Sequence, residues 1–269
     1  MSKKVISWIL YLVSLSIVVI LFYRLYQYMD VSIIRIILNH PATVLFVFMC
    51  VLIFYFLLAF LWTFIVRSFH ENMNPLNLMA IRSQGEFGKY LPGKIWNLVF
   101  ISYAAKRDLH LKASKSVSAT FIELYLSMLV LVSIILLSYH KYFIAATLLL
   151  SLLLFGYILK NYRVFVIGVA LSFIAWLIAL YGFYMLVQLD DKMSFSFFQT
   201  STFFSIGQLG GMFAFFIPAG LGVKEYLVVQ FSGDPNLTNS LILFRILFIL
   251  AEVFRYIILT ILRRKHAGQ

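Results

Sequence analysis

The sequence predicts an all-α polytopic membrane protein with about six transmembrane helices and two oppositely oriented re-entrant helical hairpins. Composition is the first reason. The 269 residues are 63% hydrophobic and only 12% charged, with a mean hydropathy of +0.97, whereas a soluble domain carries about twice that charged fraction. The second reason is that apolar windows of about 20 residues, the length that crosses a bilayer, recur along the chain. The third is that proline and glycine interrupt two further apolar regions.

The full spans are expected where the apolar windows are uninterrupted, at roughly 5–28, 41–66, 117–138, 142–159, 164–188 and 239–262. The window at 5–28 is too long for the apolar part of a signal peptide and is followed by no small-residue cleavage site, so we interpret it as a retained first span. The whole chain, 1–269, is then one integral membrane domain.

The two interrupted regions lie at about 76–104 and 195–232, and in each the apolar sequence on either side of the break is too short to cross a bilayer. Non-helical backbone at membrane depth survives only where protein or a water-filled cavity satisfies its polar groups. We therefore expect each region to enter the membrane, return on the same side and line a cavity.

Basic residues predict the orientation, because cytoplasmic loops carry an excess of lysine and arginine. With the N-terminus inside, the outer loops carry three basic residues, Arg35, Lys141 and Lys192. The inner segments carry thirteen: Lys3, Lys4, Arg67, Arg82, Lys106, Arg107, Lys112, Lys115, Lys160, Arg163, Arg263, Arg264 and Lys265. This bias predicts a multi-pass protein of the inner (cytoplasmic) membrane with both termini cytoplasmic. The first hairpin then enters from the cytoplasm and the second from outside.

The two halves of the chain have the same order of elements. Residues 1–138 and 139–269 each read as span, span, hairpin, span, and they begin on opposite sides of the membrane. This is an inverted-topology repeat, and in transporters with such repeats the broken helices form the binding site near the middle of the bilayer.

The first break holds two candidate binding lysines, Lys89 and Lys94, on either side of Pro92 and Gly93. Proline ends a helix because it lacks a donor and clashes with the preceding turn, and glycine tolerates left-handed backbone. The helix that starts after Gly93 presents amide groups and a dipole that favour an anion. A lipid phosphate site is the functional interpretation. The alternative is that both lysines extend to the cytoplasmic interface as topology anchors.

The second break repeats this pattern. Pro218 is expected to end one half-helix, Gly220 and Gly222 to allow a tight turn, and Lys224 and Glu225 to open the return helix. These five residues complete the candidate substrate-binding set. Glu225 also suits the start of a helix without any function, because a carboxylate there complements the dipole.

Ionisable residues inside apolar spans are costly, and they are functional hypotheses by default. The candidates in the predicted spans are Glu123, Arg245, Glu252 and Arg255. The last three share one helix face at spacings of seven and three residues. This stripe is either a structural charge network against Glu123 or Glu225, or a coupling site with a carboxylate that is protonated during transport. Glu86 and Lys89, three residues apart, are expected to form a local pair.

Several classes of function are not expected. The five histidines have no metal-ligand spacing, the one cysteine, Cys50, lies in an apolar run, and no nucleophile motif or phosphate-binding loop is present. We therefore expect no enzyme activity, no cofactor and no metal. The net charge of +12 lies at the ends of apolar runs, so we expect contact with anionic lipid and not with nucleic acid.

The segments GKYLPGKIW at 88–96 and PAGLGVKE at 218–225 carry a resemblance. They are similar to the G-K-Y-[IL]-P-G-x-[IV]-W and P-G-G-L-G-[VI]-[RK]-E blocks of the flippase-like transmembrane family. This family is also called the lysylphosphatidylglycerol synthase transmembrane region, and it includes the flippase part of the bacterial multiple peptide resistance factor. The chain departs from the second block at Ala219, where glycine is usual, and at Lys224, where arginine is commoner. The resemblance covers nearly the whole chain and implies lipid translocation or a role in lipid-linked glycan pathways.

The leading hypothesis is thus a flippase-like transporter of an anionic lipid, either a phospholipid or a polyprenyl-phosphate-linked species. The alternative is a non-catalytic scaffold or accessory subunit of a membrane lipid or glycan biosynthesis pathway, with a biosynthetic partner protein or a second copy of the chain as its partner.

Overall fold

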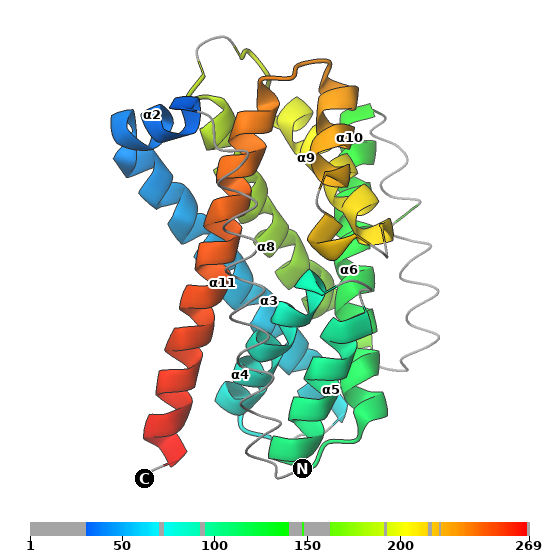
Figure 1. Ribbon diagram of the computed structural model, residues 1–269. Coiled ribbons are helices and arrows are strands. Elements are labelled where there is room, and N and C mark those ends of the chain that lie inside the picture. The colour runs from blue at the N-terminus through cyan, green and yellow to red at the C-terminus, as the bar shows by residue number, and fades with distance from the viewer. Residues whose placement is uncertain are drawn as a thin grey trace.

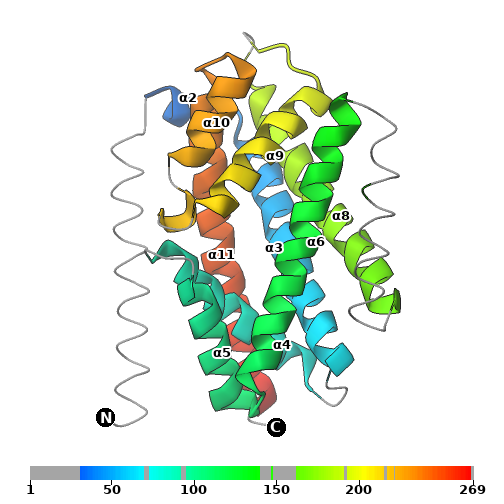
Figure 2. The same cartoon turned by 90° about the vertical axis from the view of Figure 1, so that its right-hand side faces the viewer.

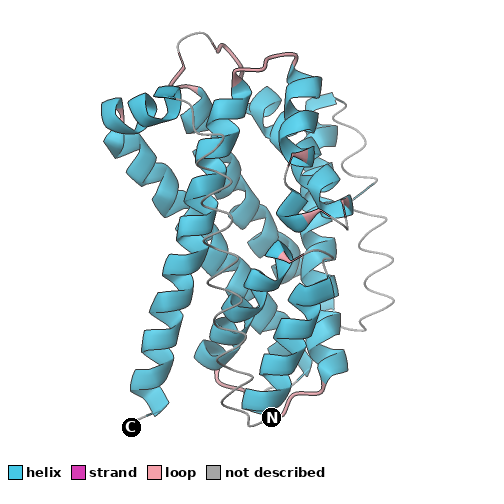
Figure 3. Ribbon diagram, viewed as in Figure 1, coloured by secondary structure: helices cyan, strands magenta, loops and turns pink. Residues whose placement is uncertain are grey.

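The described part of the protein is helical. The computed structural model describes residues 31–69, 73–91, 95–139, 147, 162–190, 193–214, 217–220 and 222–267, and these residues include no strand (Figure 3). The elements in chain order are α2 (Val31–Asn39), α3 (Pro41–Phe69), α4 (Pro75–Gly85), η1 (Glu86–Tyr90), α5 (Ile95–Leu109), α6 (Ala113–Tyr139), α8 (Tyr162–Val187), α9 (Phe197–Phe213), η2 (Pro218–Gly220), α10 (Val223–Ser232) and α11 (Leu237–Ala267).

Three of these helices are long and apolar enough to cross a membrane: α3, α6 and the part of α8 from Val164 to Val187. Their apolar windows were expected at 41–66, 117–138 and 164–188. Helix α11 covers the window expected at 239–262 and carries Arg245, Glu252 and Arg255 within its 31 residues, and it is not one of these three helices. The windows at 5–28 and 142–159 lie outside the described residues.

The first broken region forms a helical hairpin of α4, η1 and α5. Helix α4 starts where Asn74 caps it, its side chain accepting a hydrogen bond from the Leu76 amide at 2.9 Å, and Pro75 occupies the first turn. Helical structure ends at Tyr90, and Leu91 is extended (φ −80°, ψ 149°), as expected for a residue before proline. A Cβ on Gly88 would lie 2.5 Å from the Asn97 backbone nitrogen, so η1 touches the start of α5 directly.

The second broken region forms a hairpin of α9, η2 and α10. A capping box between Ser196 and Gln199 starts α9. This helix ends at Phe213, five residues before Pro218, so the expectation that Pro218 ends the half-helix was wrong: the proline begins η2. Gly220 and Gly222 have positive φ, 69° and 81°, as the turn hypothesis required.

The two hairpins occupy opposite halves of the molecule. Figures 1 and 2 show α4 and α5 in the lower half and α9 and α10 in the upper half, whereas α3, α6 and α11 run past both. The two hairpin tips, η1 and η2, contact each other. The two hairpins therefore meet at mid-height, where Glu252 and Arg245 of α11 bind their tips.

The basic helix ends gather at one end of the molecule. The last turns of α3, α5 and α11 and the first turn of α6 lie at the lower end in Figure 1. Within the described residues, these turns and the short α5–α6 connection carry Arg67, Lys106, Arg107, Lys112, Lys115, Arg263, Arg264 and Lys265. Arg35 belongs to α2 at the opposite end. Arg82, counted above as an end signal, is instead a buried residue of α4.

Helix α3 forms the centre of the framework, where it packs along α8 and also contacts α6 and α11. Phe54 on α3 lies edge-on to Trp176 on α8 with ring centroids 4.9 Å apart, and Trp62 Nε1 donates a hydrogen bond to Thr120 Oγ1 on α6 at 3.0 Å. Large apolar side chains on the outer faces of these helices stay exposed, among them Phe46, Ile53 and Phe60 on α3, Val166 and Ile174 on α8, and Leu250, Phe254 and Ile257 on α11.

Candidate functional site

A cavity of about 840 Å³ lies between the two hairpin tips and the framework helices. The first hairpin contributes Lys89 and Tyr90 to its wall, and the second contributes Lys224 and Glu225. Most of the remaining wall is apolar: Phe54, Leu58, Phe121, Leu124, Met128, Phe204, Met212, Phe213, Phe244 and Phe248. The cavity therefore combines a group of charged side chains with broad apolar walls, a combination suited to an amphiphile.

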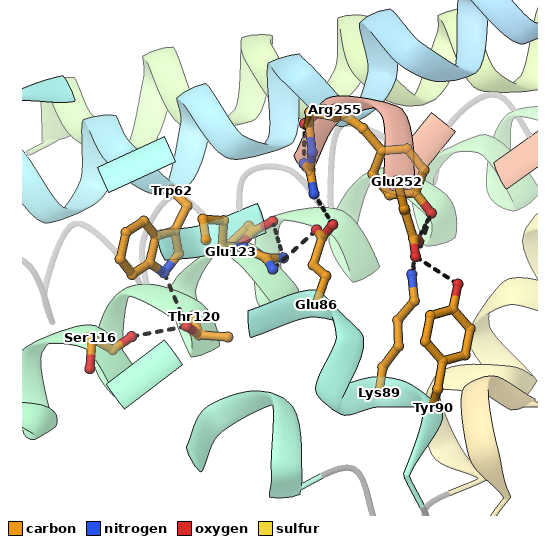
Figure 4. Close-up of polar contacts among 11 residues, drawn as sticks. Trp62, Glu86, Lys89, Tyr90, Ser116, Thr120, Glu123, Glu252 and Arg255 are labelled. Atoms are coloured by element: carbon orange, nitrogen blue, oxygen red, sulfur yellow. Dashed lines mark hydrogen bonds and ion pairs between the residues drawn. The ribbon is translucent and has the colours of Figure 1, made fainter. Parts of the chain in front are cut away.

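Glu252 on α11 is the centre of the polar contacts at the first tip. Its carboxylate accepts hydrogen bonds from the Tyr55 hydroxyl of α3 and from the Lys89 ammonium, and from the Tyr90 hydroxyl at 2.6 Å. Figure 4 shows Lys89 and Tyr90 extending from η1 toward this carboxylate. Lys89 Nζ also lies 3.3 Å from the Tyr55 hydroxyl and over the rings of both tyrosines. Glu252 is 2% exposed, whereas the Lys89 side chain is 29% exposed.

A second group of ion pairs continues from this point through the first hairpin. Arg82 on α4 forms two hydrogen bonds with Glu123 on α6, at 2.8 and 2.9 Å, and an ion pair with Glu86 at 3.0 Å. Glu86 also accepts a hydrogen bond from Arg255 on α11, whose other terminal nitrogen donates to the Tyr55 carbonyl at 2.6 Å. Figure 4 shows Glu86 between Glu123 and Arg255. These contacts attach the hairpin to α3, α6 and α11.

These two groups together form the first network, and its charges balance. Its members are three cations and three carboxylates: Arg82, Lys89, Arg255, Glu86, Glu123 and Glu252. Removing one partner of a buried pair is strongly destabilising, because it leaves a charge without compensation in a medium of low dielectric. Balance therefore has to be kept in any rearrangement of this site.

At the second tip the polarity is reversed, because here α11 supplies the cation. Arg245 binds the Glu225 carboxylate through one terminal nitrogen and the Ala219 carbonyl through the other, at 3.1 Å. The other Glu225 oxygen accepts from the Gly222 amide at 2.8 Å, which caps α10. Ala219 itself has a left-handed backbone (φ 49°, ψ 16°). Helix α11 thus holds both tips, one through Glu252 and one through Arg245.

Lys224 runs along a glycine surface on the inner side of the second hairpin. A Cβ on Gly211 would lie 2.5 Å from Lys224 Cε, and a Cβ on Gly220 would lie 2.8 Å from the Gly211 Cα. Both glycines are buried, and the absence of side chains there makes room for the lysine stem. The Lys224 side chain reaches the cavity wall by this path.

The structure brings most of the sequence-predicted site residues together. Of the first set, Lys89 lies in the cavity wall, and Pro92, Gly93 and Lys94 lie outside the described residues. Of the second set, Lys224 and Glu225 line the cavity, Gly220 and Gly222 form the turn, and Pro218 begins η2. In the charge group, Glu123, Arg245 and Glu252 line the cavity and Arg255 binds Glu86 behind it.

The pairings differ from those expected from local spacing. Glu86 was expected to pair with Lys89, but Glu86 binds Arg82 and Arg255, and Lys89 binds Glu252. Within the Arg245–Glu252–Arg255 stripe, each residue has its partner on another element. Of these pairings, the sequence predicted only the one between the stripe and Glu225.

Sequence reasoning missed Tyr55 and Tyr90 as ligands of Glu252. Tyr55 lies in a long apolar run and is 197 positions away from Glu252, so no spacing rule connects them. The one available signal was a phenol inside a span, which requires a hydrogen-bond partner when it is buried. No group of three or more metal-ligating side chains occurs within the described ranges.

Comparison of the chain with protein-family models, with curated proteins and with solved structures finds no match.

Proposed function

We propose that this protein is a flippase-like transporter that moves an anionic lipid, a phospholipid or a polyprenyl-phosphate-linked species, across the cytoplasmic membrane. The proposal includes six spans and two re-entrant hairpins in an inverted repeat, with both termini cytoplasmic. Three apolar helices of spanning length, exposed apolar side chains on their outer faces and a basic lower end support the placement in a membrane.

The observation that carries the proposal is the composition of the cavity between the tips. Apolar aromatic and aliphatic walls suit acyl or prenyl chains, and the charged group at the tips suits a headgroup. The two ion-pair networks together with Lys224 hold five basic and four acidic side chains among the described residues. Lysine and arginine donors at both tips suit an anionic headgroup.

The resemblance of segments 88–96 and 218–225 to the flippase-like family supports the same proposal. These segments form the two tips that contact each other beside the cavity. A transporter with inverted repeats would bind its substrate there and would expose the cavity to each side in turn.

The scaffold alternative is favoured by one specific observation. Lys89 is already bound to Glu252, and Arg245 is already bound to Glu225. Both ion pairs therefore also fit a purely structural role, in which they hold the tips in place. A scaffold would retain these ties permanently and would present an outer helix face to a biosynthetic partner or to a second copy.

Mass spectrometry of lipids that copurify in mild detergent separates the two. Each hydrogen bond between a charged group and phosphate contributes about 1.5–3 kcal/mol, so Lys89→Gln, Lys94→Gln or Lys224→Gln should each reduce a retained anionic lipid about tenfold or more. Lys112→Gln, an exposed residue at the lower end, is the matched control and should retain the wild-type amount. Equal retention in all four variants would favour the scaffold.

A further inference from the structure

The first tip forms an oxyanion site that the protein fills with its own carboxylate. Two phenol hydroxyls, from Tyr55 and Tyr90, and the Lys89 ammonium converge on Glu252. This is a donor set that suits any oxyanion, including a phosphodiester. Lys89, the most exposed of the four, also lines the cavity, so an oxyanion in the cavity approaches the same ammonium from the open side.

A phosphate that takes Glu252's place on Lys89 would leave the Glu252 carboxylate buried without a cation. The arginines near Glu252 in the described part of the chain are engaged elsewhere. From α4, Arg82 is shared by Glu123 and Glu86, and on α11 itself Arg255 is bound to Glu86. Arg245 lies two helical turns away on α11, where it is bound to Glu225.

One proton on Glu252 removes this conflict. With the phosphate on Lys89 and Glu252 protonated, the cluster again contains three cations and three anions: Arg82, Lys89 and Arg255 against Glu86, Glu123 and the phosphate. The proton comes from the aqueous phase and adds to the carboxylate, and no other bond forms or breaks. The neutral acid can donate one hydrogen bond and accept others, so it remains compatible with the buried site.

We propose that Glu252 is the coupling residue of this protein: an anionic lipid binds at Lys89, Tyr55 and Tyr90 together with one proton, which Glu252 takes up. The inference rests on the proposed function, because it assigns the lipid phosphate to the first tip. It adds that the lipid and a proton travel together. The charge of the first network then stays the same whether the lipid is bound or not.

Calorimetric titration of the full-length protein in a neutral maltoside detergent tests this inference. The probe is dihexanoyl phosphatidylglycerol below its micelle concentration, titrated between pH 5.5 and 8.0 in buffers of different ionisation enthalpy. Wild type should take up protons, approaching about one per bound lipid at the alkaline end. Its Kd should rise with pH by up to about tenfold per unit, as linkage to one proton requires.

Glu252→Gln gives the contrasting result. This variant removes the competing carboxylate but keeps the shape, so proton uptake should disappear and Kd should become independent of pH. At pH 8 it should bind at least tenfold tighter than wild type, a gain that a merely structural role would not produce. Asp108→Asn, a carboxylate outside the cavity wall, is the matched control and should show wild-type proton uptake.

The outcomes separate the two proposals. Lipid binding without proton uptake in wild type, with a Kd independent of pH, would overturn the role of Glu252 and leave the transporter proposal in place. No binding of the lipid would overturn both the role of Glu252 and the transport of a phospholipid. Dimethyl phosphate, which has the same phosphodiester without chains, should bind at least tenfold more weakly, and equal affinity would overturn the assignment to a lipid. The wild-type titration depends on no variant, so a folding defect in Glu252→Gln does not affect its outcome.

Discussion

At the scale of single residues, the charged groups at the two tips each have a partner that lies far away in the sequence, although Arg82 and Glu86 also pair four residues apart. Arg82 and Glu123 are 41 positions apart, and Lys89 and Glu252 are 163 positions apart. Such pairs are weak evidence of net stabilisation, because desolvation offsets much of the attraction, but loss of one partner is costly.

Arg82 and Glu123 test the cost of an uncompensated buried charge. Arg82→Met should lower the unfolding free energy by roughly 3–5 kcal/mol, because Glu123 would remain buried without its cation. The double variant Arg82→Met, Glu123→Leu should recover most of the loss, since it removes both charges. Thermal unfolding in detergent measures the two effects, and equal stability of the single and double variants would show that the pair does not couple.

Two substitutions at the second tip test its backbone strain in opposite directions. Gly222 has φ 81° and a Cβ there would touch nothing within 4 Å, so Gly222→Ala isolates the backbone term. It should destabilise the protein by about 1–2 kcal/mol. Ala219→Gly should act in the opposite direction by a smaller amount, because relief of strain at φ 49° is partly offset by the entropy that glycine loses on folding. Identical melting temperatures for both variants would contradict the positive φ values.

At the scale of elements, helix α11 connects the parts that a transport cycle would have to move. Its Glu252 and Arg245 hold the two tips through contacts of opposite polarity. The C-terminal end of α11 makes a third ion pair with the first hairpin, in addition to those of Glu252 and Arg255. Here Arg263 lies 3.0 Å from the Asp108 carboxylate of α5. Asp108 is also bound by Arg107 at 2.5 Å.

This third ion pair predicts that the stability of the protein depends on pH. Burial raises the pKa of Asp108, but the hydrogen bonds and charges of Arg107 and Arg263 outweigh it and hold that pKa below its ordinary value. A depressed carboxyl pKa contributes stability above the ordinary value, about 3.9, and the contribution is lost as pH falls through the folded-state pKa. The stability difference between wild type and Asp108→Asn should therefore be constant from pH 8 to about 5 and should vanish in stronger acid. A stability difference that instead grows as the pH falls would contradict a lowered pKa of Asp108.

At the scale of the whole molecule, the two hairpins face each other from opposite ends of one helical framework (Figure 2). In the proposed topology, the end that carries Arg67, Lys106 and Arg263 faces the cytoplasm. Cysteine labelling in a Cys50→Ala background tests it. Cysteines at Asn39 and Asn236 should react with an impermeant reagent added from outside, and cysteines at Ser114 and Gln269 should not. Outside labelling at Ser114 would rule out a first hairpin that returns to the cytoplasm.

Sequence reasoning predicted the elements better than the contacts. Apolar windows predicted α3, α6, α8 and α11 to within a few residues because burial in a membrane leaves a strong compositional signal. Proline and glycine predicted both breaks, although α9 ends at Phe213 and not at Pro218. The segment 31–39 was expected in a loop and is helical, since α2 is short and gives no window of spanning length.

The contacts of the site could not be predicted because local spacing does not determine which way a hairpin tip faces. Tertiary packing directs Lys89 toward α11 and Glu86 toward Arg255, and neither partner lies within one helical turn in the sequence. Most of the candidate residues that the structure describes nevertheless lie at the two tips or in their ion pairs, because a charge in an apolar region requires a partner.

Translocation of a headgroup-labelled phosphatidylglycerol in proteoliposomes tests the central proposal most directly. Dithionite quenching of the label from outside measures the fraction of lipid that crosses the bilayer. Wild type should move the lipid, the lysine variants Lys89→Gln and Lys224→Gln should each slow it about tenfold or more, and Lys112→Gln should not. Equal rates in wild-type vesicles and in vesicles without protein would contradict the transporter, as would normal rates in both tip variants.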